Sequence, residues 1–422
     1  MNNSVKAPRF LLISLILFSM FLVPACRTKV SLHISRDPAM ACDGGGRTAV
    51  VWREPIGGGE FRFYGTVLPD KDYTTILTAR SVTANTPKLD ATDLNQYFFT
   101  YSESTDMTRH LYGLVLNGDH LAVFSGSTQI TDAANPTDEG VPQYDIAFDP
   151  DLNRVLVVWN KPGFGHTSQL AYRFVHIVDH ETFPTDGPVQ LVPSDAGKKI
   201  NPRTVLGQYN GEGGSQDAFF VPYINKVYGS GSSRYTTVYG IFISYPDVIL
   251  NTVTIASLSG EPDPTYDYVA AAYDAGMNRY LVACRRTGQI EGYFVSESGT
   301  VSGPIIITDV VTYGTISTTR PLMLAFSETL EQYMLAYYAM PPGTGGGWKN
   351  ALFTILLDRD GVPVDSRVQR GASLNIQGGG ELDTDPSSVF KIVYEEGAIV
   401  SVGTSKELDE DSLKVYYDSY SE

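Results

Sequence analysis

The chain has 422 residues, and 42% of them are hydrophobic, which is enough for a sizeable core and excludes a globally disordered protein. Its formal net charge of −16 at pH 7 argues against a nucleic-acid partner, because binding phosphate groups requires a basic surface and no basic cluster is visible. Only 18% of the residues are charged, while Gly, Pro, Tyr and Phe are plentiful, and this composition favours strands and turns over surface helices.

The N-terminus has the features of an export signal. Lys6 and Arg9 precede an apolar run over residues 10–23. This run is shorter than the roughly 20 residues that a membrane-spanning helix needs, so we predict a signal peptide over residues 1–25. The segment Val-Pro-Ala-Cys that ends at Cys26 follows directly.

This segment resembles a bacterial lipobox, in which the cysteine is acylated and becomes the first residue of the mature protein. The resemblance implies lipidation of Cys26 and a bacterial cell-envelope location. It points to the outer membrane, because no acidic residue follows the cysteine. Cleavage after Ala25 without lipidation is the alternative, and it would give a secreted or periplasmic protein.

Two cysteines, Cys42 and Cys284, remain in the mature chain. The repeat described next places them in units that do not touch. We therefore predict two buried thiols that act as small apolar side chains, rather than a disulfide.

A short apolar strand ending in an aromatic residue, or in a substitute for one, recurs along the chain. Successive copies end about 50 to 65 residues apart, a period typical of solenoids and propellers when no helical pattern is present. The copies end at Trp52, Tyr101, Trp159, Tyr223, Cys284, Tyr337 and Tyr394.

The best-formed unit, from Tyr268 to Thr308, reads as four short strands separated by tight turns. Four antiparallel strands in each unit predict one propeller blade, since packing blades around an axis buries both faces of each sheet. We predict a single all-β propeller of seven blades, with six or eight as alternatives. The predicted blades are 36–83, 84–132, 140–195, 198–257, 263–309, 315–371 and 373–422, with either 30–34 or 413–417 completing the last.

The phrases AYDAGMNRYLVACRRTGQIEGYFVSESG and AFDPDLNRVLVVW carry the repeat most clearly. They resemble the tandem repeats of secreted bacterial β-propeller proteins. The resemblance implies a propeller over residues 26–422 but no particular activity, because such repeats occur in binding modules, scaffolds and enzymes alike.

Loop insertions gather at one end of the predicted ring. They lie between the second and third strands of a blade, at 53–60, 161–168, 224–236 and 339–350. Long Gly-rich loops with aromatic residues on a rigid scaffold favour a binding surface, although tolerated insertions would look the same. The loop side chains that we expect to bind are Phe164, His166, Tyr235 and Trp348.

The innermost strands begin at the same end, so their first polar residues should surround the mouth of the channel. Arginines next to an aspartate can recognise a carboxylate or a sugar through paired hydrogen bonds, while channel charges that pair only with one another are the alternative. The predicted mouth residues are Lys88, Gln143, Arg203, Asp267 and Arg320.

No catalytic motif, metal-ligand spacing or cofactor fingerprint stands out, so we expect no cofactor and no metal. The sequence favours a monomeric ring that binds an envelope or extracellular protein, or a polysaccharide, and that contacts the membrane only through its N-terminal lipid. The alternative is a carbohydrate-active enzyme, a glycosidase or lyase, that uses Asp267 with a second acid of the channel.

Overall fold

The three-dimensional structure is a computed structural model. It describes residues 30–31, 36–43, 47–57, 60–68, 74–80, 87–92, 95–105, 108–124, 126–132, 136, 143–163, 167–178, 181–183, 187–193, 197–211, 213–228, 235–259, 266–286, 288–309, 315–316, 321–340, 351–364, 368–369, 380–384, 390–396, 399–402, 405–408 and 414–420.

Six sheets are each built from one continuous stretch of the chain. The first contains β2 (Arg36–Cys42), β3 (Thr48–Gly57), β4 (Glu60–Leu68) and β5 (Thr74–Arg80). The second contains β6 (Lys88–Thr92), β7 (Gln96–Thr105), β8 (Thr108–Asn117) and β9 (Thr128–Gln129). The third contains β10 (Tyr144–Asp149), β11 (Arg154–Pro162), β12 (Ser168–Val178), β13 (Glu181–Phe183) and β14 (Gln190–Leu191).

The next three sheets follow the same antiparallel pattern. The fourth contains β15 (Lys198–Ile200), β16 (Val205–Gly211), β17 (Gly214–Val227), β18 (Tyr235–Ser244) and β19 (Val248–Ser259). The fifth contains β20 (Tyr266–Asp274), β21 (Arg279–Arg286), β22 (Gln289–Ser296) and β23 (Val301–Asp309). The sixth contains β24 (Thr315–Ile316), β25 (Met323–Ser327), β26 (Gln332–Met340), β27 (Ala351–Leu357) and β28 (Val368–Gln369).

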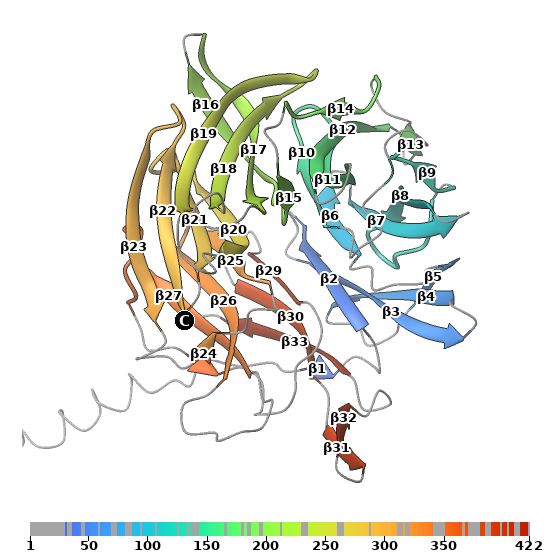
Figure 1. Ribbon diagram of the computed structural model, residues 1–422. Helices are drawn as coiled ribbons and strands as arrows, with labels where there is room; N and C mark the ends of the chain where they lie inside the picture. The colour runs from blue at the N-terminus through green and yellow to red at the C-terminus, as the bar shows by residue number, and fades with distance from the viewer. Residues whose placement is uncertain are drawn as a thin grey trace, which may run out of the picture.

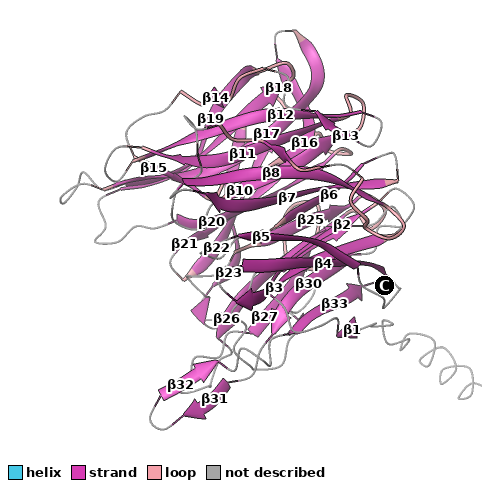
Figure 2. Cartoon of the chain, turned by 90° about the vertical axis from the view of Figure 1, so that its right-hand side faces the viewer, coloured by secondary structure: helices cyan, strands magenta, loops and turns pink. Residues whose placement is uncertain are grey.

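A seventh sheet joins the two ends of the described chain. Its strands are β29 (Gly380–Thr384), β30 (Phe390–Glu396), β33 (Lys414–Tyr420) and, at the outer edge, β1 (Val30–Ser31). Val30 pairs with Tyr417 and Ser31 with Tyr416, so strands near both termini contribute to one sheet. A separate hairpin of β31 (Ile399–Val402) and β32 (Ser405–Leu408) projects away from the sheets (Figure 2).

The inner strands of the sheets form a closed ring. In chain order β2, β6, β10, β16, β20, β25 and β29 each contact the next, and β29 contacts β2 again. Figure 1 shows these strands arranged around a common centre. The prediction of a single all-β propeller is therefore confirmed.

The hydrophobic core lies between neighbouring sheets rather than inside any one of them. Trp159 on β11 is fully buried and packs in a cluster with Phe98 on β7 of the preceding sheet. Phe220 on β17 likewise packs against Tyr280 on β21, with ring centroids 4.6 Å apart. Burying each such side chain contributes about 1.5–3 kcal/mol, so aromatic residues of the second strands hold one blade against the next.

The repeated Tyr-Gly pair needs glycine because an aromatic ring from the neighbouring strand occupies the space that a side chain would fill. A Cβ atom on Gly113 would lie 2.5 Å from Phe98 Cζ, and one on Gly240 would lie 2.5 Å from Phe220 Cε2. These contacts are far too short for carbon atoms, so only glycine leaves room for the aromatic ring of the second strand.

The two cysteines differ in their surroundings. Cys284 is fully buried between the fourth and fifth sheets, as predicted, and burial raises the pKa of its thiol. The prediction of burial was wrong for Cys42, which is half-buried because it ends β2 at the rim of the ring. Its sulfur lies 3.5 Å from Thr48 Oγ1, and no disulfide joins the two cysteines within the described part of the chain.

Candidate functional site

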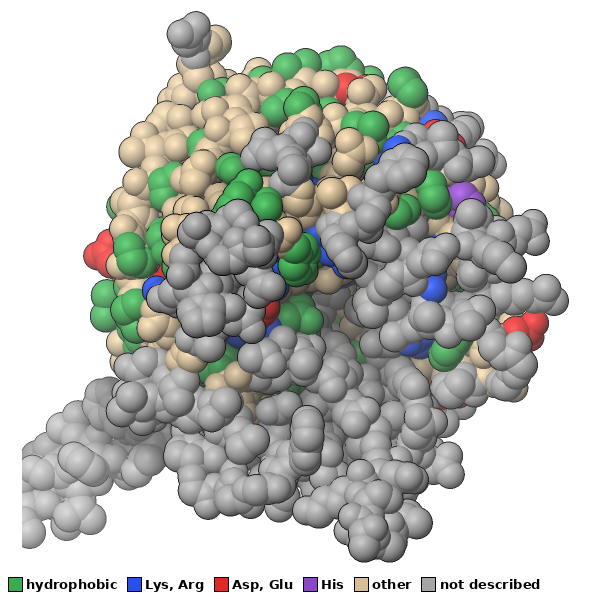
Figure 3. Space-filling view, in the orientation of Figure 1, with side chains coloured by type: hydrophobic (Ala, Val, Ile, Leu, Met, Phe, Trp, Pro, Cys, Tyr) green, Lys and Arg blue, Asp and Glu red, His purple; other side chains and the backbone are tan. Residues whose placement is uncertain are grey.

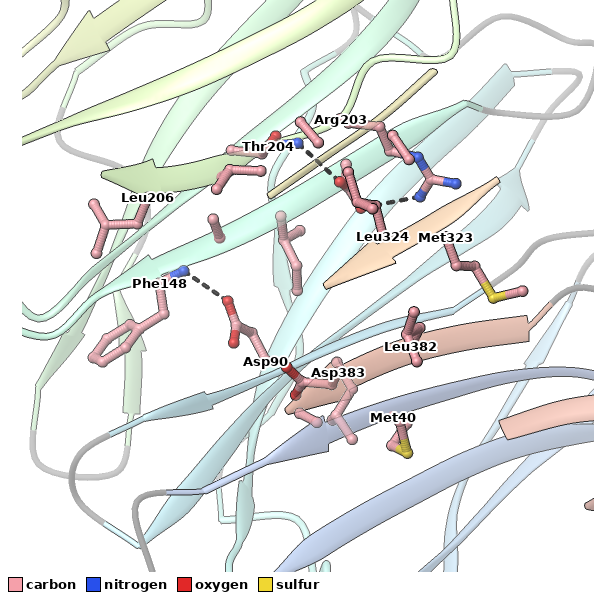
Figure 4. Close-up of a pocket in the computed structure, with 18 of the residues that line it drawn as sticks. Met40, Asp90, Phe148, Arg203, Thr204, Leu206, Met323, Leu324, Leu382 and Asp383 are labelled. Atoms are coloured by element: carbon pink, nitrogen blue, oxygen red, sulfur yellow. Dashed lines mark hydrogen bonds and ion pairs between the residues drawn. The ribbon is translucent and has the colours of Figure 1, made fainter. Parts of the chain in front are cut away.

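A cavity of about 320 Å³ lies in the central channel and is lined by residues from all seven inner strands or the segments next to them (Figure 4). Most of the lining residues are apolar, but most of the surface that they expose to the cavity is polar. The polar lining residues are Asp90, Asp145, Arg203, Thr204 and Asp383. A concave, half-open space with several convergent polar groups is a candidate site for a small polar molecule.

Each of the three lining aspartates links one inner strand to the next. The Cys42 N–H donates to Asp383 Oδ2 (2.9 Å), and the Phe148 N–H donates to Asp90 Oδ2 (2.7 Å). The Thr204 N–H donates to Asp145 Oδ2 (2.9 Å). Each donor lies on an inner edge, where the sheet itself provides no partner, so a carboxylate of the adjacent blade replaces the missing strand.

We call the end of the channel where the inner strands begin the mouth. There Asp145 also forms ion pairs with two basic side chains. Lys88 Nζ lies 3.0 Å from Asp145 Oδ1, and an Arg203 guanidinium nitrogen lies 3.8 Å from the same oxygen. Arg203 also donates to the carbonyl oxygens of Val269 and Leu322, both at 3.4 Å. Arg203, at the start of the inner strand of the fourth blade, therefore contacts the third, fifth and sixth blades at the mouth.

Asp90 is held in an environment that opposes its charge. Burial, followed by the nearby carboxylate of Asp383, raises the pKa of Asp90 to about 8, although the N–H groups of Phe148 and Ala91 both donate to it. Desolvation and like charge disfavour the ionised form by more than these two hydrogen bonds favour it.

A second cluster lies at the mouth between the fourth and fifth sheets. Lys226 Nζ lies 2.8 Å from Asp267 Oδ1, and Arg285 lies 3.5 Å from Asp267 Oδ2. The buried Arg285 guanidinium stacks over the ring of Tyr268, 4.5 Å from its centroid. Burial lowers the pKa of Arg285, and the Asp267 carboxylate opposes this change.

Asn201 joins this cluster to the third blade. Its backbone N–H donates to Gln143 Oε1 (2.7 Å), and its side-chain amide donates to the carbonyl oxygen of Asp267. An exposed aromatic residue, Tyr228, extends beyond Lys226, and the nearby Asp267 carboxylate contributes to raising the pKa of its hydroxyl after the larger effect of burial. The mouth thus combines paired charges, an amide and an accessible aromatic ring.

Glu291 forms a buried network beside this cluster. It accepts hydrogen bonds from the hydroxyls of Tyr266 (2.9 Å) and Tyr293 (2.8 Å), and from Gln289 and Arg286. Burial raises the pKa of Glu291, but these four donors together lower it below its ordinary value. A fully bonded carboxylate of this kind stabilises one arrangement of the blade and leaves little capacity for a ligand.

Four of the predicted mouth residues are brought together by these contacts, namely Lys88, Gln143, Arg203 and Asp267. Tyr235 begins β18, opposite Val227 and next to the partner of Lys226 in the ladder. Five other predicted residues, Cys26, Phe164, His166, Arg320 and Trp348, lie outside the described residues.

Sequence reasoning missed Asp90, Asp145, Asp383, Lys226 and Arg285. The available signal was an acidic residue in an otherwise apolar inner strand, as in KLDAT, YDIAF and GELDT. Among the described residues no group of three or more His, Cys, Asp or Glu side chains is arranged to hold a metal ion. Nor does that part of the chain contain a helix long and apolar enough to cross a membrane.

Solved structures resemble the fold but share little sequence. A protein of unknown function from Dyadobacter fermentans aligns with a TM-score of 0.49 and 9% identity, over 94% of this chain and 99% of that one. A puromycin hydrolase mutant aligns with a TM-score of 0.50 and 13% identity, over 89% of this chain and 53% of its own, so this chain spans about half of its length. An α-L-arabinofuranosidase from Fusarium graminearum aligns with a TM-score of 0.46 and 14% identity, over 79% of this chain and 98% of that one.

At 13% identity, the match to the puromycin hydrolase mutant is a similarity of fold alone. No protein-family model matches the sequence, and no curated protein matches it.

The raised pKa of Asp90 predicts a pH-dependent stability. An aspartate in the unfolded chain ionises near pH 4, whereas Asp90 in the folded protein ionises near pH 8. Between these values the folded state binds one more proton than the unfolded state, so the contribution of Asp90 to the free energy of unfolding falls as pH rises from about 4 to about 8. Relative to Asp90→Asn, the native protein should lose stability across this window.

Urea unfolding of both proteins at several pH values measures this difference. Asp119→Asn, which changes an exposed carboxylate paired with Arg47 at the opposite end of the ring, is the matched control and should follow the native profile. Parallel profiles for the native protein and Asp90→Asn would contradict the assignment.

Proposed function

We propose that this protein is an exported, lipid-anchored binding or scaffold module that presents the mouth of its channel to an envelope protein or an extracellular polymer. The observation that carries the proposal is the gathering of charged side chains from several blades at one end of the ring. These are Lys88, Asp145, Arg203, Lys226, Asp267 and Arg285. Figure 3 shows Lys and Arg side chains close to the centre of the face seen in Figure 1.

The mouth has the chemistry for binding a carboxylate or a sugar. Arg203, Lys226 and Asp267 keep 20%, 14% and 19% of their side-chain surface exposed, so a ligand can reach them. Their ion pairs can exchange with ligand carboxylates or hydroxyls through charge-assisted hydrogen bonds. Tyr228 offers a ring, 61% exposed, for stacking on an apolar face of the ligand.

The second strands of the blades finish at the same end, because each runs antiparallel to the inner strand of its blade. We propose that Phe164, His166, Arg320 and Trp348 add contacts from the loops that follow these strands and from the adjoining strand start. The ring acts as a monomer, and its anchor at Cys26 places it at the outer membrane.

A carbohydrate-active enzyme is less well supported. Asp267 is held between Lys226 and Arg285, which suits it to positioning a ligand better than to donating a proton. Asp90 and Asp383 accept backbone hydrogen bonds that join neighbouring strands, so each has a structural role. A binding role therefore explains more of the contacts at the mouth than a hydrolytic role does.

Mass spectrometry of the mature N-terminus tests the anchor. We expect an acylated Cys26 as the first residue, and Cys26→Ser should release the protein from the membrane fraction. An unmodified Cys26, or an N-terminus upstream of it, would contradict lipid anchoring.

Substitutions at the mouth test the binding face. Lys226→Gln and Tyr228→Ala should each weaken binding to an envelope partner or a polysaccharide at least about tenfold, since each removes a contact at the proposed centre of the interface. Biolayer interferometry against envelope fractions and a glycan array measures the binding.

The matched controls, Arg47→Gln and Met277→Ala, change a charged and an exposed apolar residue at the opposite end of the ring. They should bind as the native protein does, and thermal unfolding should show all four variants folded. Equal losses at both ends, or no loss at the mouth, would overturn the proposal.

A further inference from the structure

The cavity extends into the channel from the mouth, with which it shares Asp145 and Arg203. Asp90 on β6 and Asp383 on β29 line it on one side, and Figure 4 shows their carboxyl groups close together. Asp90 accepts two backbone N–H groups and Asp383 accepts one. Each oxygen of a carboxylate has two lone pairs, so Asp90 can accept a further hydrogen bond when it is ionised.

Thr204 is the second observation that points to a ligand. The residue lines the cavity and is only 8% exposed, and its backbone N–H donates to Asp145. Its buried hydroxyl oxygen has no hydrogen-bond partner among the described residues. A buried hydroxyl without a partner costs about 1–3 kcal/mol, and a ligand group in the cavity would remove this cost.

The charges that face Asp90 come from several elements. Asp383 on β29 and Asp145 on β10 are the nearby carboxylates that raise its pKa to about 8, after the larger effect of burial. The basic side chains at the mouth, Lys88 on β6 and Arg203 before β16, form ion pairs with Asp145 rather than with Asp90. A positive charge in the cavity would therefore relieve the repulsion between Asp90 and Asp383.

Most of the surface that faces the cavity is polar, although most of the lining residues are apolar. The side chains of Leu89, Ile146, Phe148, Leu324 and Leu382 are buried in the hydrophobic core clusters. At about 320 Å³ the cavity has room for a small organic molecule rather than only a metal ion or a few waters.

We propose that the channel cavity binds a small primary-amine ligand, whose ammonium group faces Asp90 and Asp383 and whose hydroxyl or similar group bonds Thr204. This site lies inside the channel and goes beyond the proposed role of the mouth. Both could operate in one molecule.

Proton linkage gives the site a distinctive signature. Near neutral pH, Asp90 must release its proton when the ammonium binds, and the proton passes to the buffer. Affinity should therefore rise with pH up to about 8, as long as the amine itself stays protonated.

Isothermal titration with matched probes tests the site on the full mature protein. Aminohexanol carries the ammonium, an apolar chain and a hydroxyl, hexanediol lacks the ammonium, and hexylammonium lacks the hydroxyl. We expect aminohexanol to bind at least about tenfold tighter than hexanediol, and about threefold or more tighter than hexylammonium. Titrations at pH 7 in two buffers of different ionisation enthalpy should show proton release on binding of either amine.

Variants assign the contacts. Asp90→Asn should weaken binding of aminohexanol about tenfold or more and abolish proton release, whereas Thr204→Val should remove only the preference over hexylammonium. Asp119→Asn, at the opposite end of the ring, is the control and should bind normally. Where Asp90→Asn fails to fold, the native protein with the three probes decides the matter.

The proposal is overturned if the native protein binds hexanediol as tightly as aminohexanol. It is also overturned if neither amine gives a saturable signal in the millimolar range. Loss of amine binding with intact binding at the mouth would reject the cavity site and leave the proposed function standing, and the reverse result would reject only the function.

Discussion

The inner edges of the sheets impose the constraint on which the channel depends. The innermost strand of each blade has N–H groups on the edge that faces the channel, where no neighbouring strand can accept their hydrogen bonds. Leaving such groups without a partner is costly when they are buried. Aspartates from adjacent blades supply acceptors at three of these junctions, at Cys42, Phe148 and Thr204. The same side chains that stabilise the ring therefore line the cavity, and its acidic character follows from how the inner strands are joined.

Packing between blades keeps this arrangement fixed. Tyr101, Trp159 and Tyr337, which end repeat copies on second strands, pack in clusters that span two neighbouring sheets, and glycines of the third strands make room for aromatic rings. Pairing of β1 with β33 places strands from both ends of the chain in one sheet, so the ring closes without a disulfide among the described residues. A scaffold closed in this way can hold charged groups at the mouth in fixed positions, which a binding surface requires.

The sequence predicted the architecture because the architecture is periodic. The spacing of Trp52, Trp159 and Tyr337 reports the length of a blade, and the Tyr-Gly pairs report aromatic rings packed over a bare backbone. Periodicity also placed Lys88, Gln143, Arg203 and Asp267 at one end of the channel, since each stands at the start of an inner strand.

The partners of those residues could not be predicted in the same way. Lys226 and Arg285 reach Asp267 from the second strands of two different blades, and that meeting depends on how the blades sit against each other. Asp90 and Asp383 are far apart in the sequence and become neighbours only when the ring closes. The half-buried position of Cys42 has a similar origin, because burial at a strand end depends on the rim of the assembled ring.

Amide hydrogen exchange at single-residue resolution tests most directly whether aspartates join the inner strands. The account predicts that the Phe148 amide is protected in the native protein and exchanges roughly tenfold faster in Asp90→Ala, because a buried N–H that loses its acceptor costs about 1–3 kcal/mol. The amides of Cys42 and Thr204, held by Asp383 and Asp145, should keep their protection in the same variant. Equal exchange of Phe148 in both proteins would contradict the claim that Asp90 links the second blade to the third.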